Sequence, residues 1–415
     1  MKLHSLFVLV YVIFVDWQAV AAQDNRYGFY FTNRQMRVHI PFQFRSNLII
    51  IPVCINEREV ASFIVDTGVG PTIITDARAF QLQHFTVSRR LNMAGVGGEN
   101  TLEASVAINN SIRVGSLRAD HHALVILQED VLNLSEYAGV PIHGIIGYEL
   151  FANLVVTIDF QHQVLTLTQP DHFRYRRSKG DRYPISIQDN KAYTNALSVS
   201  NGSQSLPLRL VIDTGAGQAL LLDRYQRSAA PVSGKIVRVP LGRGLTGFIH
   251  GQMGRLPMVY IGRYLLNNVL VSYPDSTDFG RKLTNLPQRQ GNVGCELLRR
   301  FRVTFNFPER YMILKPVKQM LRAPFEHDMS GLELRARSDN LSRYFIAQLV
   351  RQSPAERAGL QVGDELLIIN NSPADTLTMG DIQAMLQAGD GKPVSLIIRR
   401  HGQLIPYHFS LKRLI

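Results

Sequence analysis

The sequence is short of the features that mark several other classes of protein. Its 415 residues include two cysteines and one tryptophan, and they contain no low-complexity tract. Two cysteines are too few for a disulfide framework. Cys54 and Cys295 each lie among apolar residues, so we expect buried free thiols. A bridge between them would be allowed in an exported protein, but spacing alone does not support it.

Metal and phosphate motifs are also missing. The twelve histidines show no His-x-x-x-His or His-Glu-x-x-His spacing. The adjacent pair His121-His122 would point to opposite faces of a strand. A Gly-rich stretch, Gly95-Val96-Gly97-Gly98, is followed by neither Lys-Ser/Thr nor a helical pattern, so it reads as a mobile hairpin tip rather than a phosphate loop. We expect no metal and no cofactor.

Charge and composition are those of a basic globular protein. Lys and Arg number 45 against 33 Asp and Glu, a formal net charge of +12, and 45% of the residues are hydrophobic. This charge favours acidic partners in general. No module with aromatic strands interleaved by basic residues is present, so we expect no nucleic-acid partner. The length and composition predict a packed core and two or three domains.

The first 22 residues have the pattern of a cleaved secretory signal. Lys2 precedes an apolar run, Leu6–Val15, and small residues close the segment at Ala19–Ala22. The run is short for a membrane span, which needs roughly 20 apolar residues, although an uncleaved anchor remains the alternative. No later segment is long and apolar enough to span, so we expect a soluble mature protein.

One motif is written twice. Phe63–Gly70 and Leu210–Gly217 both deliver an Asp from an apolar run into a Thr-Gly turn, and Asp213 lies 147 positions after Asp66. Apolar, β-branched flanks predict a buried strand, where a carboxylate is costly. Two such carboxylates in matching surroundings indicate a site assembled from two halves.

The same offset extends well beyond the motif. It also relates Asp76 to Asp223, Gly95 to Gly242, Gly144–Leu150 to Gly291–Leu297, and Val156–Phe160 to Val303–Phe307. We therefore predict two homologous, mainly β lobes over residues 35–317, joined by a basic linker at 169–180. Strands are expected at Leu48–Asn56, Val60–Asp66, Val125–Leu127, Val155–Phe160 and Val164–Thr168, and short helices at Tyr148–Asn153 and Cys295–Phe301.

Two carboxylates in an apolar cleft would share one proton, because like charge and burial both oppose double ionisation. The charged member could then take a proton from a water while the protonated member donates to a substrate carbonyl. Thr67 and Thr214 could tie the two loops together without adding charge. Gly68 and Gly215 would let backbone N–H groups approach the carboxylates. Coupled titration predicts activity shifted toward acid pH.

With these motifs, the lobes resemble the retropepsin-like aspartic proteases. The resemblance rests on the two Asp-Thr-Gly loops and on the closing motif Ile145-Ile146-Gly147. It implies two β-barrel lobes, Asp66 and Asp213 as the catalytic pair, and peptide bonds as the substrate. It also implies flaps at Gly95-Val96-Gly97-Gly98 and at Gly242 and Gly244. The second closing motif departs from the family pattern, because Asn292 stands where an apolar residue is usual.

The last 85 or so residues resemble a PDZ domain of the kind attached to bacterial proteases. The motifs that carry the resemblance are Ser353-Pro354-Ala355, Ala358-Gly359-Leu360, Val362-Gly363-Asp364 and Ile368-Ile369-Asn370. PDZ domains bind a chain end as an added strand. The resemblance implies Gly331, Leu332, Glu333 and Leu334 as the receiving edge, facing a helix at Met379–Gln387. A module used only for packing or dimerisation is the alternative.

The predicted organisation is a signal peptide at 1–22, lobes at 23–170 and 171–320, and the PDZ domain at 328–415. The predicted function is an exported, periplasmic aspartic endopeptidase acting on polypeptides. The alternative is a PDZ-based peptide-binding scaffold with inactive lobes. One chain supplies both carboxylates, so the chemistry requires no dimer and the oligomeric state stays open.

Overall fold

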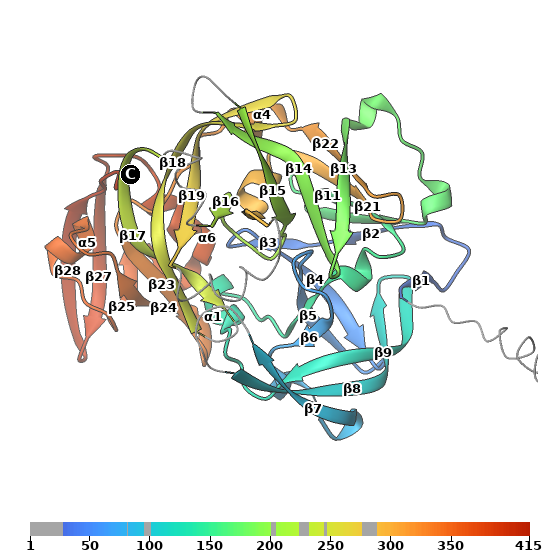
Figure 1. The fold of residues 1–415 in the computed structure, drawn as a ribbon. Coiled ribbons are helices and arrows are strands. Elements are labelled where there is room, and N and C mark those ends of the chain that lie inside the picture. Colours follow the sequence, from blue (N-terminus) through green and yellow to red (C-terminus); the bar gives the residue numbers. More distant parts are fainter. Residues whose placement is uncertain are drawn as a thin grey trace, which may run out of the picture.

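A computed structural model describes residues 28–80, 82–94, 101–200, 205–223, 232–244, 247–275 and 289–415. In this part the chain is mainly β, as predicted, and its strands form three sheets (Figure 1). The C-terminal module, drawn in red, packs beside the rest of the molecule. None of the helices described here is long and apolar enough to cross a membrane. The expected signal at 1–22 lies outside the described residues.

The first sheet belongs to the N-terminal half. Its order is β1-β9-β6-β10-β5-β4-β8-β7, with β3 paired to β4. Its strands are β1 (Tyr30–Phe31), β3 (Gln43–Arg45), β4 (Leu48–Ile55), β5 (Glu59–Val65), β6 (Thr72–Ile74), β7 (Thr86–Ala94), β8 (Thr101–Val114), β9 (Leu117–Leu127) and β10 (Gly144–Ile146).

The second sheet joins both halves of the chain. Its order is β17-β18-β19-β16-β20-β15-β14-β13-β22-β21-β11-β12-β2. From the first half it takes β2 (Arg37–Pro41), β11 (Val155–Asp159) and β12 (Val164–Thr168). From the second half come β13 (Asp181–Gln188), β14 (Lys191–Ser200), β15 (Ser205–Ile212), β16 (Leu220–Leu222), β17 (Ser233–Gly244), β18 (Gly247–Ile261), β19 (Tyr264–Pro274), β20 (Gly291–Val293), β21 (Phe301–Asn306) and β22 (Tyr311–Pro316).

Strand pairing repeats with the offset seen in the sequence. β5 pairs in parallel with β10 through Phe63 and Gly144, and β15 pairs in parallel with β20 through Leu210 and Gly291. Equivalent residues also meet each other: Thr157 on β11 pairs with Thr304 on β21, their Oγ1 atoms 2.8 Å apart. Contacts of a residue with its own counterpart are the mark of an approximate two-fold axis.

The helices of the two halves are shorter than predicted. The helix expected at Tyr148–Asn153 is a single 3₁₀ turn, η3 (Tyr148–Leu150), and that expected at Cys295–Phe301 is α3 (Cys295–Leu298). The second must stop early because Phe301 already pairs with Pro316 between β21 and β22. The other helices among the described residues are α1 (Leu134–Ala138), α4 (Lys318–Arg322), α5 (Pro354–Ala358), α6 (Met379–Leu386), and the 3₁₀ turns η1 (Ala77–Ala79), η2 (Leu82–His84), η4 (Pro170–His172), η5 (Arg177–Lys179) and η8 (Ala374–Thr376).

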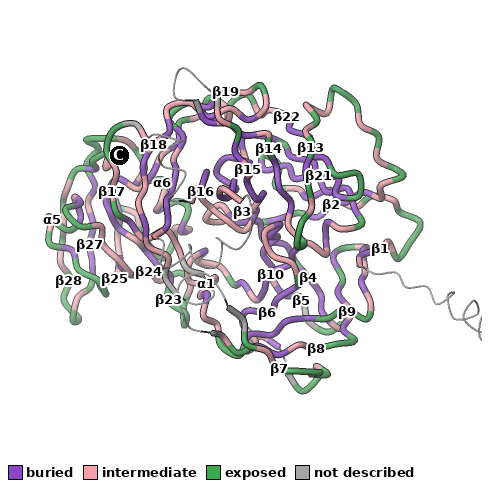
Figure 2. The backbone as a smooth tube through the Cα atoms, viewed as in Figure 1, coloured by how far each residue is buried: buried purple, intermediate pink, exposed green. Residues whose placement is uncertain are grey.

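One apolar core runs through both halves, and the C-terminal module has a core of its own. Buried backbone therefore fills the middle of the first two sheets in Figure 2. Cys54 and Cys295 are both buried and free, as expected.

The C-terminal module is a small sheet in the order β23-β24-β25-β27-β28, with β26 paired to β25. Its strands are β23 (Leu332–Arg337), β24 (Asn340–Leu349), β25 (Glu365–Ile369), β26 (Ser372–Pro373), β27 (Pro393–Arg400) and β28 (Gln403–Ser410). Ser353 caps α5 by accepting from the Glu356 N–H, and Gly359 ends it at φ +93°, as the sequence predicts. β23 lies at the sheet edge, as predicted, although Gly331 precedes the strand.

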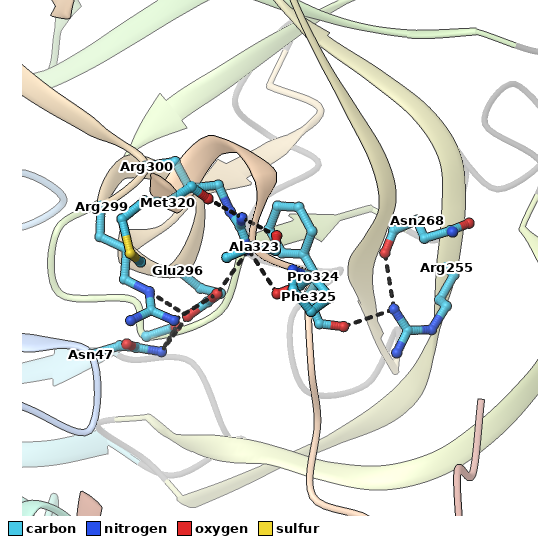
Figure 3. Close-up of polar contacts among 11 residues, drawn as sticks. Asn47, Arg255, Asn268, Glu296, Arg299, Arg300, Met320, Ala323, Pro324 and Phe325 are labelled. Carbon is cyan, nitrogen blue, oxygen red and sulfur yellow. Dashed lines mark hydrogen bonds and ion pairs between the residues drawn. The ribbon is translucent and has the colours of Figure 1, made fainter. Parts of the chain in front are cut away.

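A buried arginine fastens the segment that leads into this module (Figure 3). Arg300 has no exposed surface, and its guanidinium donates to the carbonyls of Met320 (2.7 Å), Ala323 (2.5 Å) and Pro324 (3.2 Å). It also contacts Glu296 at 3.3 Å. Burial lowers the pKa of Arg300 to about 10, so the group keeps its charge at neutral pH.

Candidate active site

The two motif carboxylates lie at matching strand ends. Asp66 follows β5 and Asp213 follows β15. The Asp66 N–H donates to the Ile146 carbonyl at 2.9 Å, and the Asp213 N–H donates to the Val293 carbonyl at 3.0 Å. Each parallel partner strand therefore holds one Asp-Thr-Gly loop in the same position, and the two side chains are hydrogen-bonded to each other.

The two threonines cross-link the loops, as predicted. The Thr67 N–H donates to Thr214 Oγ1 at 3.0 Å, and the Thr214 N–H donates to Thr67 Oγ1 at 3.1 Å. Each hydroxyl then donates to a carbonyl of the opposite half, Thr67 to Ile212 (2.7 Å) and Thr214 to Val65 (2.8 Å). Both threonines are fully buried, so this four-bond link fixes the spacing of the carboxylates.

The glycines of the motif leave room for the carboxylates. The Gly68 N–H donates to Asp66 Oδ1 at 2.7 Å, and the Gly215 N–H donates to Asp213 Oδ1 at 3.2 Å. A Cβ on Gly215 would lie 2.1 Å from Asp66 Oδ2, and one on Gly68 would lie 2.9 Å from Asp213 Oδ1. No larger residue fits either position without displacing the pair.

Burial raises the pKa of Asp66 well above its ordinary value, and the nearby Asp213 charge raises it further. Backbone N–H groups of Gly68 and Gly215 act in the opposite direction, with smaller effect than burial. A buried carboxyl of this kind keeps its proton at pH values where an exposed one would lose it. Burial and the neighbouring charge thus both favour the protonated form of Asp66.

Replacing Thr214 by Val tests the threonine cross-link. Valine keeps the shape but leaves the Thr67 N–H and the Val65 carbonyl without their partner, so the free energy of unfolding should fall by about 2 to 3 kcal/mol. Peptide cleavage should fall with it. Urea unfolding and a cleavage assay measure both effects. Thr157→Val is the control, because it makes the same change at the two-fold contact between Thr157 and Thr304, and it should leave cleavage intact. Equal loss of cleavage in both variants would contradict the role of the threonine cross-link in spacing the carboxylates.

Polar groups that the sequence did not assign surround Asp213. The Asn292 amide donates to Asp213 Oδ2 at 2.5 Å, and Arg289 donates to Asn292 Oδ1. Lys191 also lines the cleft, and burial lowers its pKa while the charges of Asp213 and Asp66 raise it. The polar Asn292 was visible as a departure from the family pattern, but its contact with Asp213 was not predicted.

Of the two predicted flaps, the structure describes the residues of the second but not those of the first. Gly95, Val96, Gly97 and Gly98 lie outside the described residues, although the flanking strands β7 and β8 pair as a hairpin. Gly242 and Gly244 lie on β17, in the hairpin that β17 forms with β18. Residues of this second hairpin line the cleft, including Gly242 itself. Among the described residues, β7 and β8 contribute none.

A cleft of about 1110 Å³ contains both carboxylates and continues to the C-terminal module. Its wall there is formed by the loop before β23, by β23 and by α6, and includes all four residues predicted to receive a peptide, Gly331, Leu332, Glu333 and Leu334. Helix α1 of the first half packs against β23, and the Arg335 guanidinium lies 4.9 Å from the centre of the Tyr137 ring. The predicted peptide edge and the carboxylate pair thus share one cavity.

The loop before β23 contains a titrating carboxyl. Asp328 accepts from the Ser330 N–H (3.0 Å), the Ser330 hydroxyl (2.8 Å) and the Gly331 N–H (2.5 Å). Burial nevertheless raises its pKa to about 6, so folding binds a proton here between about pH 4 and pH 6. The stabilisation that protonated Asp328 gives the folded protein is fully present below the pKa that Asp328 has in the unfolded chain. It is lost as the pH rises through about 6, the pKa of Asp328 in the folded protein.

Asp328→Asn removes this titration. As pH rises from 4 to 7, the wild type should lose about 2 kcal/mol of unfolding free energy that the variant does not lose. Urea unfolding at several pH values measures it. Parallel pH profiles for the two proteins would show that Asp328 titrates normally.

In the part of the chain that the structure describes, no group of three or more His, Cys, Asp or Glu side chains is placed to hold a metal ion.

Comparison with known families agrees with this architecture. Residues 51–150 match the family model described as aspartyl protease, and residues 345–400 match that of the PDZ domain. No curated protein matches the chain. The chain therefore carries an aspartyl protease domain and a C-terminal PDZ domain. The first match includes Asp66 and ends before Asp213.

Proposed function

We propose that this chain is an aspartic endopeptidase in which Asp66 and Asp213 activate water to hydrolyse peptide bonds. The observation that carries the proposal is the meeting of the two carboxylates at an approximate two-fold axis, cross-linked by Thr67 and Thr214. The chain would thus contain two retropepsin-like lobes derived by duplication, each supplying half of the site.

The chemistry follows from one proton shared by the pair. The ionised carboxyl removes a proton from a water held between the two side chains, and the protonated carboxyl donates to the carbonyl oxygen of the scissile bond. Collapse of the resulting tetrahedral intermediate needs a proton on the leaving nitrogen, which the carboxyl that accepted the proton from water can return. The buried position of the pair strengthens each of these interactions.

The PDZ domain would engage the same polypeptide. β23 has a free edge in the sheet order and lies across from α6, the arrangement in which a peptide adds as a strand. Because this groove opens into the cleft that contains Asp66 and Asp213, a bound segment would be led toward the carboxylates. Binding of a chain end with its free carboxylate belongs to the same proposal.

Export is part of the proposal and rests on the sequence. The charged start, short apolar run and small-residue end of residues 1–22 are those of a secretory signal. We infer that the protein acts outside the cytoplasm. The resemblance of its C-terminal module to the PDZ domains of bacterial proteases makes the periplasm the proposed compartment.

The test is to incubate the protein comprising residues 23–415 with unfolded polypeptides at pH values from 3 to 8. Fragments should form at acid to neutral pH, and a transition-state-mimicking inhibitor of aspartic proteases should suppress them. Absence of cleavage at every pH, together with retained peptide binding, would favour a PDZ-based binding protein instead.

A further inference from the structure

The two halves of the site differ at three equivalent positions. In the first half Leu48, Ile142 and Ile145 are apolar, and their counterparts in the second half are Lys191, Arg289 and Asn292. Leu48 begins β4 directly after the Ser46-Asn47 turn, as Lys191 begins β14 directly after the Asp189-Asn190 turn. The repeat thus supplies an internal comparison, in which these three positions have polar side chains in the second half only. A symmetric pair of carboxylates would share a proton equally, so this difference bears on which one is charged.

Asn292 is the polar residue that contacts the pair directly. It is 7% exposed and sits on β20, the strand that pairs in parallel with β15 and so lies beside the strand leading to Asp213. Its Nδ2 donates to Asp213 Oδ2 at 2.5 Å, while its Oδ1 accepts from Arg289. The Arg289 contact orients the amide so that its donor side faces the carboxylate.

A buried amide donor stabilises an ionised carboxylate more than a protonated one. Asp213 has this donor in addition to the Gly215 N–H. Asp66 has backbone donors, and the equivalent position in its own half is Ile145, which has no hydrogen-bonding side chain.

We propose that Asn292 is a positioning residue that keeps the negative charge of the pair on Asp213, leaving the shared proton on Asp66. The proposal rests on the proposed peptidase function for its consequence in catalysis: Asp213 is then the base that acts on water, and Asp66 the acid that donates to the carbonyl. The raised pKa of Asp66 is consistent with this assignment.

Among the described residues, four other titratable groups interact with Asp213. They are Asp66 at the end of β5, Lys191 at the start of β14, Arg289 before β20, and Cys295 at the start of α3. Lys191 and Arg289 favour the ionised form of Asp213, and a charge on Asp66 opposes it. Burial raises the pKa of the Cys295 thiol well above its usual value, so this group stays neutral. Asn292 is distinguished from the cations because it acts through one oriented hydrogen bond.

The test compares the pH profile of kcat/KM for wild type and Asn292→Leu, both as the full chain without residues 1–22. Loss of the donor destabilises every state in which Asp213 is ionised, so the pair loses its first proton at higher pH. The acid limb of the kcat/KM profile should therefore shift to higher pH by about one to two units. The alkaline limb should move less, because Asp213 is ionised on both sides of that step.

Ile145→Leu is the matched control, because it changes the equivalent residue of the first half without removing a hydrogen bond. It should leave the acid limb in place even if the height of the profile falls. Asn292→Ala serves where the leucine variant does not fold. An acid limb unchanged or moved to lower pH in a folded Asn292 variant would overturn the proposal.

A second measurement separates this inference from the peptidase function. In an Asp66→Asn background Asp213 is the member of the pair that titrates, and infrared difference spectra can follow its carboxyl C=O band against pH. Adding Asn292→Leu should raise the midpoint by about one to two pH units. A wild-type protein without cleavage would reject the proposed function, whereas an unchanged midpoint would reject the role of Asn292.

Discussion

Replacing either Asp66 or Asp213 by Asn is expected to lower the rate of peptide cleavage by about 10³-fold. Asparagine has the shape of aspartate, and its carbonyl oxygen can still accept from the glycine N–H two residues later, at 2.7 Å from Gly68 or 3.2 Å from Gly215. It can neither remove a proton from water nor donate an acidic proton. The loss should therefore be chemical, with kcat falling far more than KM changes.

The fold should survive both substitutions, with Asp213→Asn the less stable of the two because its new amide nitrogen faces the Asn292 amide donor. Asp66→Asn removes one of two like carboxyls from a buried site, so the free energy of unfolding should stay the same or rise. Circular dichroism and urea unfolding check the fold, and cleavage of a peptide substrate checks the activity. A folded Asp66→Asn or Asp213→Asn protein with wild-type cleavage would eliminate the two-carboxylate mechanism.

Arg300→Met should lower the free energy of unfolding by about 3 to 5 kcal/mol. Methionine fills part of the same volume but leaves three backbone carbonyls, those of Met320, Ala323 and Pro324, without a donor in a buried place. It also removes the cation that lies 3.5 Å from the centre of the Phe325 ring. The segment 318–325 should loosen, and limited proteolysis should cut it faster than in wild type.

The neighbouring Arg299 supplies the control. Arg299 is 31% exposed and pairs with the same Glu296 at 2.8 Å, so Arg299→Met should cost less than about 1 kcal/mol. Urea unfolding of both variants measures the difference. Equal destabilisation would mean that the ion pair with Glu296, rather than the capture of the three carbonyls, accounts for the effect of Arg300.

Much of this architecture could be predicted because it is encoded locally. The paired Asp-Thr-Gly motifs, the alternation of the strands and the Ser353 cap are patterns within a few residues of one another. The internal repeat also allowed a long-range prediction, because it indicated that Asp66 and Asp213 belong to one site although 147 positions separate them. Helix length was predicted less well: pairing of β21 with β22 ends α3 earlier than the local pattern suggests.

The contacts that complete the site depend on packing between distant segments. Asn292 lies 79 positions after Asp213 and in the sequence is merely a polar residue in an apolar strand. Nothing in the PDZ pattern indicates that β23 and α6 would face the carboxylates across one cavity, because that depends on how two separately folded cores dock. Arg300 is similar, since its partners besides Glu296 are backbone carbonyls, which carry no sequence signal.

The two-fold contacts also bear on how a polypeptide could enter and leave. Separation of the halves would break both the buried threonine cross-link and the ladder between β11 and β21. Such a hinge between the halves is costly, so the proposed catalytic pair would keep one spacing throughout a turnover. In the proposed peptidase, passage of substrate and release of products would then depend on walls of the cleft that are not cross-linked in this way. Among the described residues these include the β17–β18 hairpin and the PDZ face. Movement of such walls, rather than separation of the two halves, would set the rates at which substrate enters and products leave.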